Sequence, residues 1–190
     1  MTDLTGLFDA LYSRLLLRDV FGKIVPGSVF LLAVASTVAP AKEVLDYVAN
    51  MPFGIWTAFL GAAWITAFAI QSLGECTGAI KYHSKDSDQR FYKLKNKLDL
   101  STKNVQKQQF ERLVVIKEAC GNGYVSLLLS SFVLILDHLV THSFSTTARS
   151  LLSVWDFALS ILVIIIFLAR MHFVHIQRQD LYLKVVLDDD

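Results

Sequence analysis

Histidine and aspartate side chains gather near one predicted membrane boundary, where they could bind a metal ion or act as a proton-linked switch. His138 and His142 are four residues apart on one helix face, with Asp137 beside them and Asp156 opening the next apolar run. Imidazole and carboxylate groups are zinc ligands, and imidazole changes charge near neutral pH. The alternative is that these side chains cap helices and bond to water. We favour it, because two histidines and an aspartate at a membrane edge are a weak signal.

A second polar group is expected at the cytosolic ends of the apolar runs and comprises Gln71, Glu75, Arg170, His172 and His175. Glu75 and Arg170 can pair across two helices, so we interpret this group as structural. The centres of the apolar runs carry only serine and threonine, which argues against a charged pathway through one subunit. The sequence contains no phosphate-binding glycine loop, GxSxG, HExxH or paired-cysteine metal spacing. We therefore expect a non-enzymatic protein without a cofactor or metal ion.

Four long apolar runs must position these residues. Of the 190 residues, 54% are hydrophobic, and they concentrate in residues 20–41, 53–74, 121–140 and 151–170. Each run approaches the roughly 20 residues that cross a bilayer as a helix. We expect an all-α polytopic membrane protein with four transmembrane helices and cytosolic helical extensions. Residues 1–19 predict an amphipathic helix, which either lies on the membrane surface or packs against the chain's own helices.

The distribution of basic residues predicts the orientation. Residues 75–118 hold ten of the 18 lysines and arginines. Placing this segment and both chain ends in the cytosol leaves only Lys42 and Arg149 outside, as the positive-inside rule requires. The predicted parts are an interfacial helix (1–19), a first transmembrane hairpin (20–74), a cytosolic basic helical segment (75–118), a second hairpin (119–172) and a cytosolic tail (173–190). The expected location is the bacterial inner membrane.

Pro26 interrupts the first apolar run. Proline lacks an amide hydrogen, so the carbonyl one turn earlier loses its partner and the helix kinks. Gly22 and Gly27 flank this point and permit close backbone approach. Gly22, Pro26 and Gly27 therefore form either a hinge or a static kink used for packing, and we favour the static kink.

Small residues in the second run predict a helix-packing face. Gly54, Ala58 and Ala62 recur every four residues, with Gly61 alongside. Lipid provides no hydrophobic force between helices, so small residues favour association by allowing close van der Waals contact. Two partners are open for this face, another span of this chain or another subunit.

The cytosolic segments carry the candidate partner-binding surface. Basic and aromatic residues alternate there, namely Arg90, Phe91, Lys93, Lys95, Lys97, Lys103 and Lys107. From Lys103 a helix is expected to continue without interruption into the third run. The final LYLKVVL, with Tyr182 and Leu183, is more typical of a strand, although it could also bind a partner's groove as a helix. Direct nucleic-acid contact is not expected, because most of this positive charge is what any inner loop shows.

The segment FGKIVPG, after an amphipathic start, resembles small four-span bacterial inner-membrane proteins that accompany antiphage defence genes, including the membrane subunits of Kiwa systems. The resemblance covers the topology and this segment. It implies a homo-oligomer in the inner membrane that senses envelope disturbance and holds a soluble, DNA-binding partner at its cytosolic face.

These features predict an inner-membrane sensor or anchor that recruits a soluble cytosolic protein through its basic loop and tail, with the lipid bilayer and further copies of itself as the other partners. The alternative is a homo-oligomeric pore that depolarises the membrane. Pro26 and the serines of the third run motivate that alternative.

Overall fold

The computed structural model describes residues 19–81, 104–141 and 148–188, and these residues are helical with no strand among them. A π-helical segment at 19–24 leads into α2 (Val25–Ala35). The other helices are α3 (Ala41–Ala49), α4 (Phe53–Cys76), α6 (Asn104–Thr141) and α7 (Ala148–Asp188). The predicted all-α class is confirmed for this part of the chain, whereas the predicted N-terminal amphipathic helix falls almost entirely outside the described residues.

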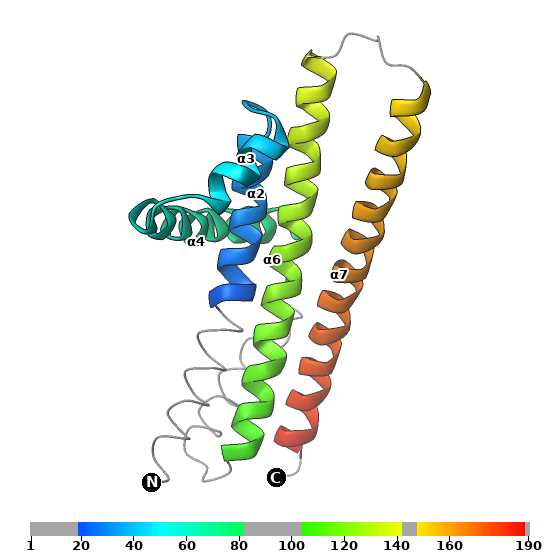
Figure 1. Ribbon diagram of the computed structural model, residues 1–190. Coiled ribbons are helices and arrows are strands. Elements are labelled where there is room, and N and C mark those ends of the chain that lie inside the picture. Colours follow the sequence, from blue (N-terminus) through cyan, green and yellow to red (C-terminus); the bar gives the residue numbers. More distant parts are fainter. Residues whose placement is uncertain (1–18, 82–103, 142–147, 189–190) are drawn as a thin grey trace.

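The two longest helices, α6 and α7, form an antiparallel pair (Figure 1). On its other side α6 contacts α2, and both α2 and α6 contact α4. In Figure 1 α4 runs across α2 and α6 instead of alongside them, while α3 caps the far end of α2. α6 is therefore the central element, because it packs against every other long helix.

Helices α6 and α7 are much longer than a bilayer crossing requires. At about 1.5 Å per residue, their 38 and 41 residues extend about 57 and 62 Å, roughly twice the hydrocarbon thickness. The prediction of one uninterrupted helix entering the third run is confirmed by α6. The strand-like interpretation of residues 181–187 is wrong, because α7 continues through them to Asp188. Packing of α7 along α6 outweighs the β-propensity of that segment.

Among the described residues, three helices are long and apolar enough to cross a membrane, with apolar windows at Phe53–Cys76, Phe110–Asp137 and Ile161–Tyr182. The first predicted span is not among them, because its α-helix covers only 11 residues, or about 16 Å. Ser36 and Thr37 donate side-chain hydrogen bonds to the carbonyls of Leu32 and Val34 at 2.8 and 2.7 Å. These bonds satisfy the last turn, and the chain then bends toward α3.

Large apolar side chains cover the outward faces of the three long helices. Exposed examples lie on α4, α6 and α7 and include Phe53, Ile65, Phe132, Ile135, Ile166 and Phe167. A soluble protein rarely exposes continuous apolar faces of this kind. The arrangement is compatible with helices that face lipid.

Candidate functional site

The interior of this fold is unusually polar. Eight polar or charged side chains are at most 5% exposed, and they follow α6 along the faces that meet α2, α4 and α7. We call this set the polar seam: Lys23, Lys117, Asn122, Ser126, Ser130, His172, His175 and Gln179. Polar groups inside membrane helices are costly unless they bond to one another or to the backbone, so each of them requires a partner.

Three members of the polar seam form a ladder on α6. Asn122, Ser126 and Ser130 are four residues apart and therefore share one helix face, which lies against α2. The Asn122 side-chain amide donates to the Gly22 carbonyl at 2.7 Å, and the Ser126 hydroxyl donates to the Pro26 carbonyl at 2.5 Å. The ladder thus binds α6 to the backbone of α2 at two successive turns.

The first of these bonds explains how Pro26 is accommodated. In a regular α-helix the nitrogen of residue 26 would donate to the Gly22 carbonyl, and proline has no hydrogen to give. Asn122 supplies the missing donor from α6. The π-helical segment at 19–24 immediately precedes this point, so the helix is locally irregular beside Pro26.

The glycine after Pro26 brings α2 into direct contact with α4. A Cβ atom placed on Gly27 would lie 1.8 Å from the Ala63 carbonyl oxygen, far inside van der Waals contact. Gly22, Pro26 and Gly27 are all buried. The structure therefore places the predicted hinge residues in a packed junction, and any hinge motion there would have to break the bonds from Asn122 and Ser126.

Lys23 joins α4 to this junction. Its ammonium group donates to the Gln71 side-chain carbonyl and lies 3.8 Å from the centroid of the Phe68 ring. The Asn122 amide approaches the same Gln71 oxygen at 3.5 Å. A cation is stabilised both by the face of an aromatic ring and by an amide oxygen, so the two contacts hold the Lys23 ammonium between α4 and this junction.

The other half of the polar seam joins α6 to α7. The Lys117 ammonium donates to the Gln179 side-chain carbonyl at 2.8 Å. His172 Nδ1 lies 2.8 Å from the Lys117 carbonyl, and the Lys81 amide donates to His172 Nε2 at 3.3 Å. A carbonyl only accepts and an amide N–H only donates, so these contacts fix His172 as the neutral tautomer with its proton on Nδ1. Gly121 makes room for this ring, because a Cβ atom there would lie 2.9 Å from Nδ1.

The turn after α4 closes over this half. Gly78 adopts a left-handed conformation (φ +71°), and the Ile80 amide donates to the Gly74 carbonyl at 2.8 Å. Ile80 is thereby buried against Gly74, and the Tyr124 hydroxyl donates to the Ala79 carbonyl. The start of the basic segment is thus fastened to α6 and α7 before the chain continues.

Several polar atoms of the seam have no protein partner among the described residues. They are Asn122 Oδ1, Ser130 Oγ, His175 Nδ1 and Gln179 Nε2. Atoms of this kind in a buried site are normally satisfied by water or a ligand. The polar seam can therefore hold solvent or ligand groups in addition to its protein bonds.

The predicted partner-binding residues lie mostly outside the described part of the chain, as Arg90, Phe91, Lys93, Lys95, Lys97 and Lys103 do. Lys107 and Leu183 belong to α6 and α7. The Tyr182 ring stacks on Phe110 with centroids 6.0 Å apart, so it contacts its own chain. A role for these residues in binding a partner stays a prediction.

The predicted helix-packing residues Gly54, Ala58, Gly61 and Ala62 are exposed. Within the described residues α4 packs through a different small-residue face, with Ala63 and Ala67 fully buried. Of the two partners expected for the exposed face, another span of this chain does not contact it there, and another subunit stays a prediction.

The predicted polar groups at the helix ends have mixed outcomes. Gln71, His172 and His175 lie in or beside the polar seam, whereas Glu75 and Arg170 are exposed instead of buried as a pair. Where the side chains are described, no cluster of histidine, cysteine, aspartate or glutamate has metal-site geometry. His142 lies outside the described residues.

Sequence reasoning missed Lys23, Asn122, Lys117 and Gln179. The available signal was the spacing of Asn122, Ser126 and Ser130, four residues apart within an apolar run. Comparisons of the chain with models of protein families, with characterised proteins and with solved structures find no match.

Proposed function

We propose that this chain is a non-enzymatic anchor or sensor subunit of the bacterial inner membrane that recruits a soluble cytosolic protein. In this proposal the membrane is crossed four times, with α2 and its π-helical segment as the short first crossing. Both chain ends and the basic segment lie in the cytosol. Several copies of the chain associate in the bilayer, and the recruited partner can be a DNA-binding protein of an antiphage defence system.

The paired extension of α6 and α7 carries this proposal. About 20 residues suffice for a bilayer crossing, so each helix has roughly as many again beyond it. Charged residues lie at the end where α6 begins and α7 finishes, including Glu111, Arg112, Arg178 and Asp180. The stacking of Phe110 on Tyr182 and the bond from Lys117 to Gln179 keep the two helices together there.

A paired helical extension of this kind suits partner binding better than catalysis. It holds the neighbouring basic segment at a fixed distance from the bilayer, and it adds a rigid surface of two helices. Basic residues beside aromatic ones favour an acidic protein surface as the partner.

The first test replaces Arg90, Lys93, Lys95, Lys97, Lys103 and Lys107 by glutamine and leaves every helix described here in place. Tagged wild-type protein is purified from the membrane, its soluble partner is identified by mass spectrometry, and direct binding is measured with the purified partner. We expect binding to be lost in the six-glutamine variant. It should persist in a control with Lys42→Gln and Arg149→Gln, and equal binding by both variants would refute the proposal.

Orientation is tested separately, because removing basic residues can alter topology. In a background with Cys76→Ser and Cys120→Ser, a membrane-impermeant maleimide should label Ser145→Cys in intact cells. Lys95→Cys should react only after the membrane is permeabilised. Labelling of Lys95→Cys in intact cells would show that the basic segment lies outside.

A second candidate function is a pore formed by several copies. The unpartnered polar atoms of the buried seam favour it, because such atoms attract water along α6. A pore protein should collapse the membrane potential when expressed alone, as reported by a potential-sensitive dye. An anchor should leave the potential unchanged in the absence of its partner.

A further inference from the structure

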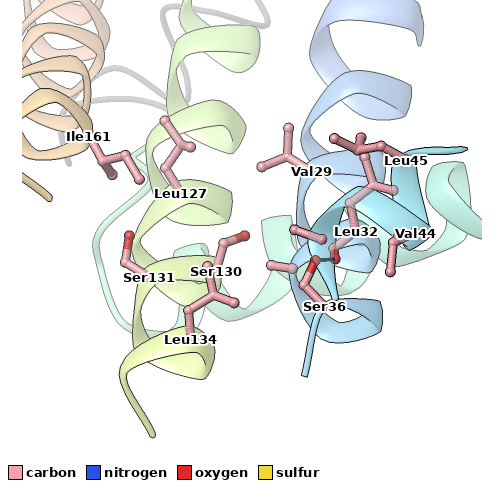
Figure 2. A pocket seen from close by; sticks show the side chains of 12 residues that line it. Val29, Leu32, Ser36, Val44, Leu45, Leu127, Ser130, Ser131, Leu134 and Ile161 are labelled. Atoms are coloured by element: carbon pink, nitrogen blue, oxygen red, sulfur yellow. Dashed lines mark hydrogen bonds between the residues drawn. The ribbon is translucent and has the colours of Figure 1, made fainter. Parts of the chain in front are cut away.

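A cavity of about 320 Å³ lies between α2 and α3 on one side and the C-terminal half of α6 on the other. We call this C-terminal half the outer half of α6. Figure 2 shows Val29 and Leu32 of α2 facing Leu127 and Leu134 of α6 across it, with α3 at its side. The lining is almost entirely apolar, and the volume is at the lower end of the range of small-ligand sites. The cavity therefore suits a narrow, largely apolar molecule.

One polar group in this cavity has no partner. Ser130 is 5% exposed, and its hydroxyl makes no hydrogen bond in the described structure. In Figure 2 this hydroxyl points from α6 into the space before α2. The two preceding members of the ladder, Asn122 and Ser126, both reach backbone carbonyls, Asn122 that of Gly22 just before α2 and Ser126 that of Pro26 in α2. The cavity keeps Ser130 from making the equivalent contact, so its hydroxyl remains available to a ligand.

The position of the cavity identifies the source of its occupant. Leu127, Ser130 and Leu134 lie within the apolar window of α6, and Ile161 lies within that of α7. On another face of α6, Leu128 is 46% exposed. Hydrocarbon chains are the molecules that surround such a helix in a bilayer, which is the location proposed above.

One wall of the cavity is formed by α3, whose residues Ala41, Val44 and Leu45 contribute to the lining. The same helix exposes Lys42, Glu43 and Asp46. A short helix with one charged face and one apolar face is typical of the membrane–water interface. A lipid that enters beside α3 would therefore have its headgroup at the mouth of the cavity and its ester bonds and chain inside.

We propose that this cavity binds one acyl chain of a membrane phospholipid, and that the Ser130 hydroxyl donates a hydrogen bond to the ester carbonyl of that lipid. A single hydrocarbon chain is narrow enough for the space, whereas a helix of a second copy, about 10 Å across, is not. Water is a poor occupant because the lining is almost entirely apolar, and the hydroxyls of Ser36, Ser130 and Ser131 offer few of the several hydrogen bonds per molecule that buried water needs.

The test uses the full-length chain reconstituted into nanodiscs of phosphatidylcholine that contain a phosphatidylcholine with a diazirine on one acyl chain. After irradiation, cross-linked peptides are identified by mass spectrometry. We expect adducts to concentrate on cavity residues of α2 and α6 and to exceed those on exposed positions such as Phe132 and Ile135. Ser130→Ala should lower the cavity adducts about fivefold, the effect of losing one hydrogen bond.

Two further variants separate a cavity site from ordinary lipid contact. Ala41→Phe places a ring in the cavity from α3 and should reduce the cavity adducts to the level of the exposed positions. Leu128→Phe places the same ring on the exposed side of α6 and should leave the cavity adducts unchanged. Circular dichroism and gel filtration show whether each variant keeps the fold, and Ser130→Ala remains a test if Ala41→Phe does not.

The possible failures are distinguishable. A chain that does not enter nanodiscs overturns the membrane location and this site together. A chain that enters but is labelled evenly along its exposed faces, with no response to Ser130→Ala or Ala41→Phe, overturns the lipid site alone.

Discussion

The two halves of the contact between α2 and α6 use the same kind of residue with opposite results. In the inner half, at the start of α2, Asn122 donates to the Gly22 carbonyl at 2.7 Å and Ser126 donates to the Pro26 carbonyl at 2.5 Å. In the outer half, Ser130 occupies the next position of the same ladder and has no partner, because a cavity lies before it. One helix face is thus tightly bonded at one end and loosely packed at the other.

The difference shows which conditions let a polar side chain on α6 bond to the neighbouring helix. In the inner half, Pro26 leaves a carbonyl of α2 without its helical donor, and Gly27 lets α4 press against the same turn. A donor on α6 then has an acceptor within reach. In the outer half α2 is a regular helix whose carbonyls are satisfied internally, so a serine on α6 gains little from close approach.

The largest expected effect is at the tight end, in Gly27→Ala. The added methyl group would meet the Ala63 carbonyl oxygen at 1.8 Å, so α2 and α4 would have to separate. We expect a loss of about 3 kcal/mol in the free energy of unfolding, the upper part of the range for overpacking. Titration with denaturing detergent, followed by circular dichroism, measures it.

Gly61→Ala is the matched control for Gly27→Ala. A Cβ atom at Gly61 meets nothing within 4 Å, and alanine is the better helix former by about 1 kcal/mol. We expect unchanged or slightly increased stability. Equal losses in the two variants would mean that the close contact between α2 and α4 is not what makes glycine necessary at position 27.

A double-mutant cycle tests whether Asn122 compensates for Pro26. Asn122→Leu keeps the volume but removes the donor to the Gly22 carbonyl, and should cost about 2 kcal/mol. In a Pro26→Ala background the new backbone N–H supplies that donor, so the same change should cost about 1 kcal/mol less. Loss of the weak contact to Gln71 is common to both arms and cancels. If the effects of the two substitutions were additive, Asn122 would not be compensating for Pro26.

The sequence predicted the carbonyl that Pro26 leaves without a donor, but it could not predict that Asn122 supplies the donor. A proline in an apolar run implies a carbonyl without its donor, which is a local property of the chain. The donor lies 100 residues away, and although Asn122 is spaced four residues from Ser126, nothing local shows which carbonyl it bonds. The all-α class and the long α6 followed from composition and from the absence of proline after residue 52, which are also local.

The face that α4 buries and the length of α2 depend on contacts between helices, which the sequence pattern alone does not show. Gly54, Ala58 and Ala62 and the buried pair Ala63 and Ala67 have the same four-residue spacing. The position of Gly27 selects the second face for contact within the chain. Similarly, the first apolar run is long enough on composition. Its α-helix is short because residues 19–24 are π-helical and the chain turns after Ala35, where Ser36 and Thr37 bond to carbonyls of the last turn, and a hydropathy profile does not register these features.

The smallest effect compares two serines of the ladder directly. Ser126→Ala removes a bond to the Pro26 carbonyl and should cost about 0.6 kcal/mol, the usual value for a hydrogen bond between membrane helices. In delipidated detergent, Ser130→Ala removes a buried hydroxyl that has no partner and should change the free energy of unfolding little or raise it. The same titration applied to both variants gives the difference between them. If Ser130→Ala proved the more damaging, Ser130 would have a protein partner in solution, and the outer half of the contact would close like the inner half.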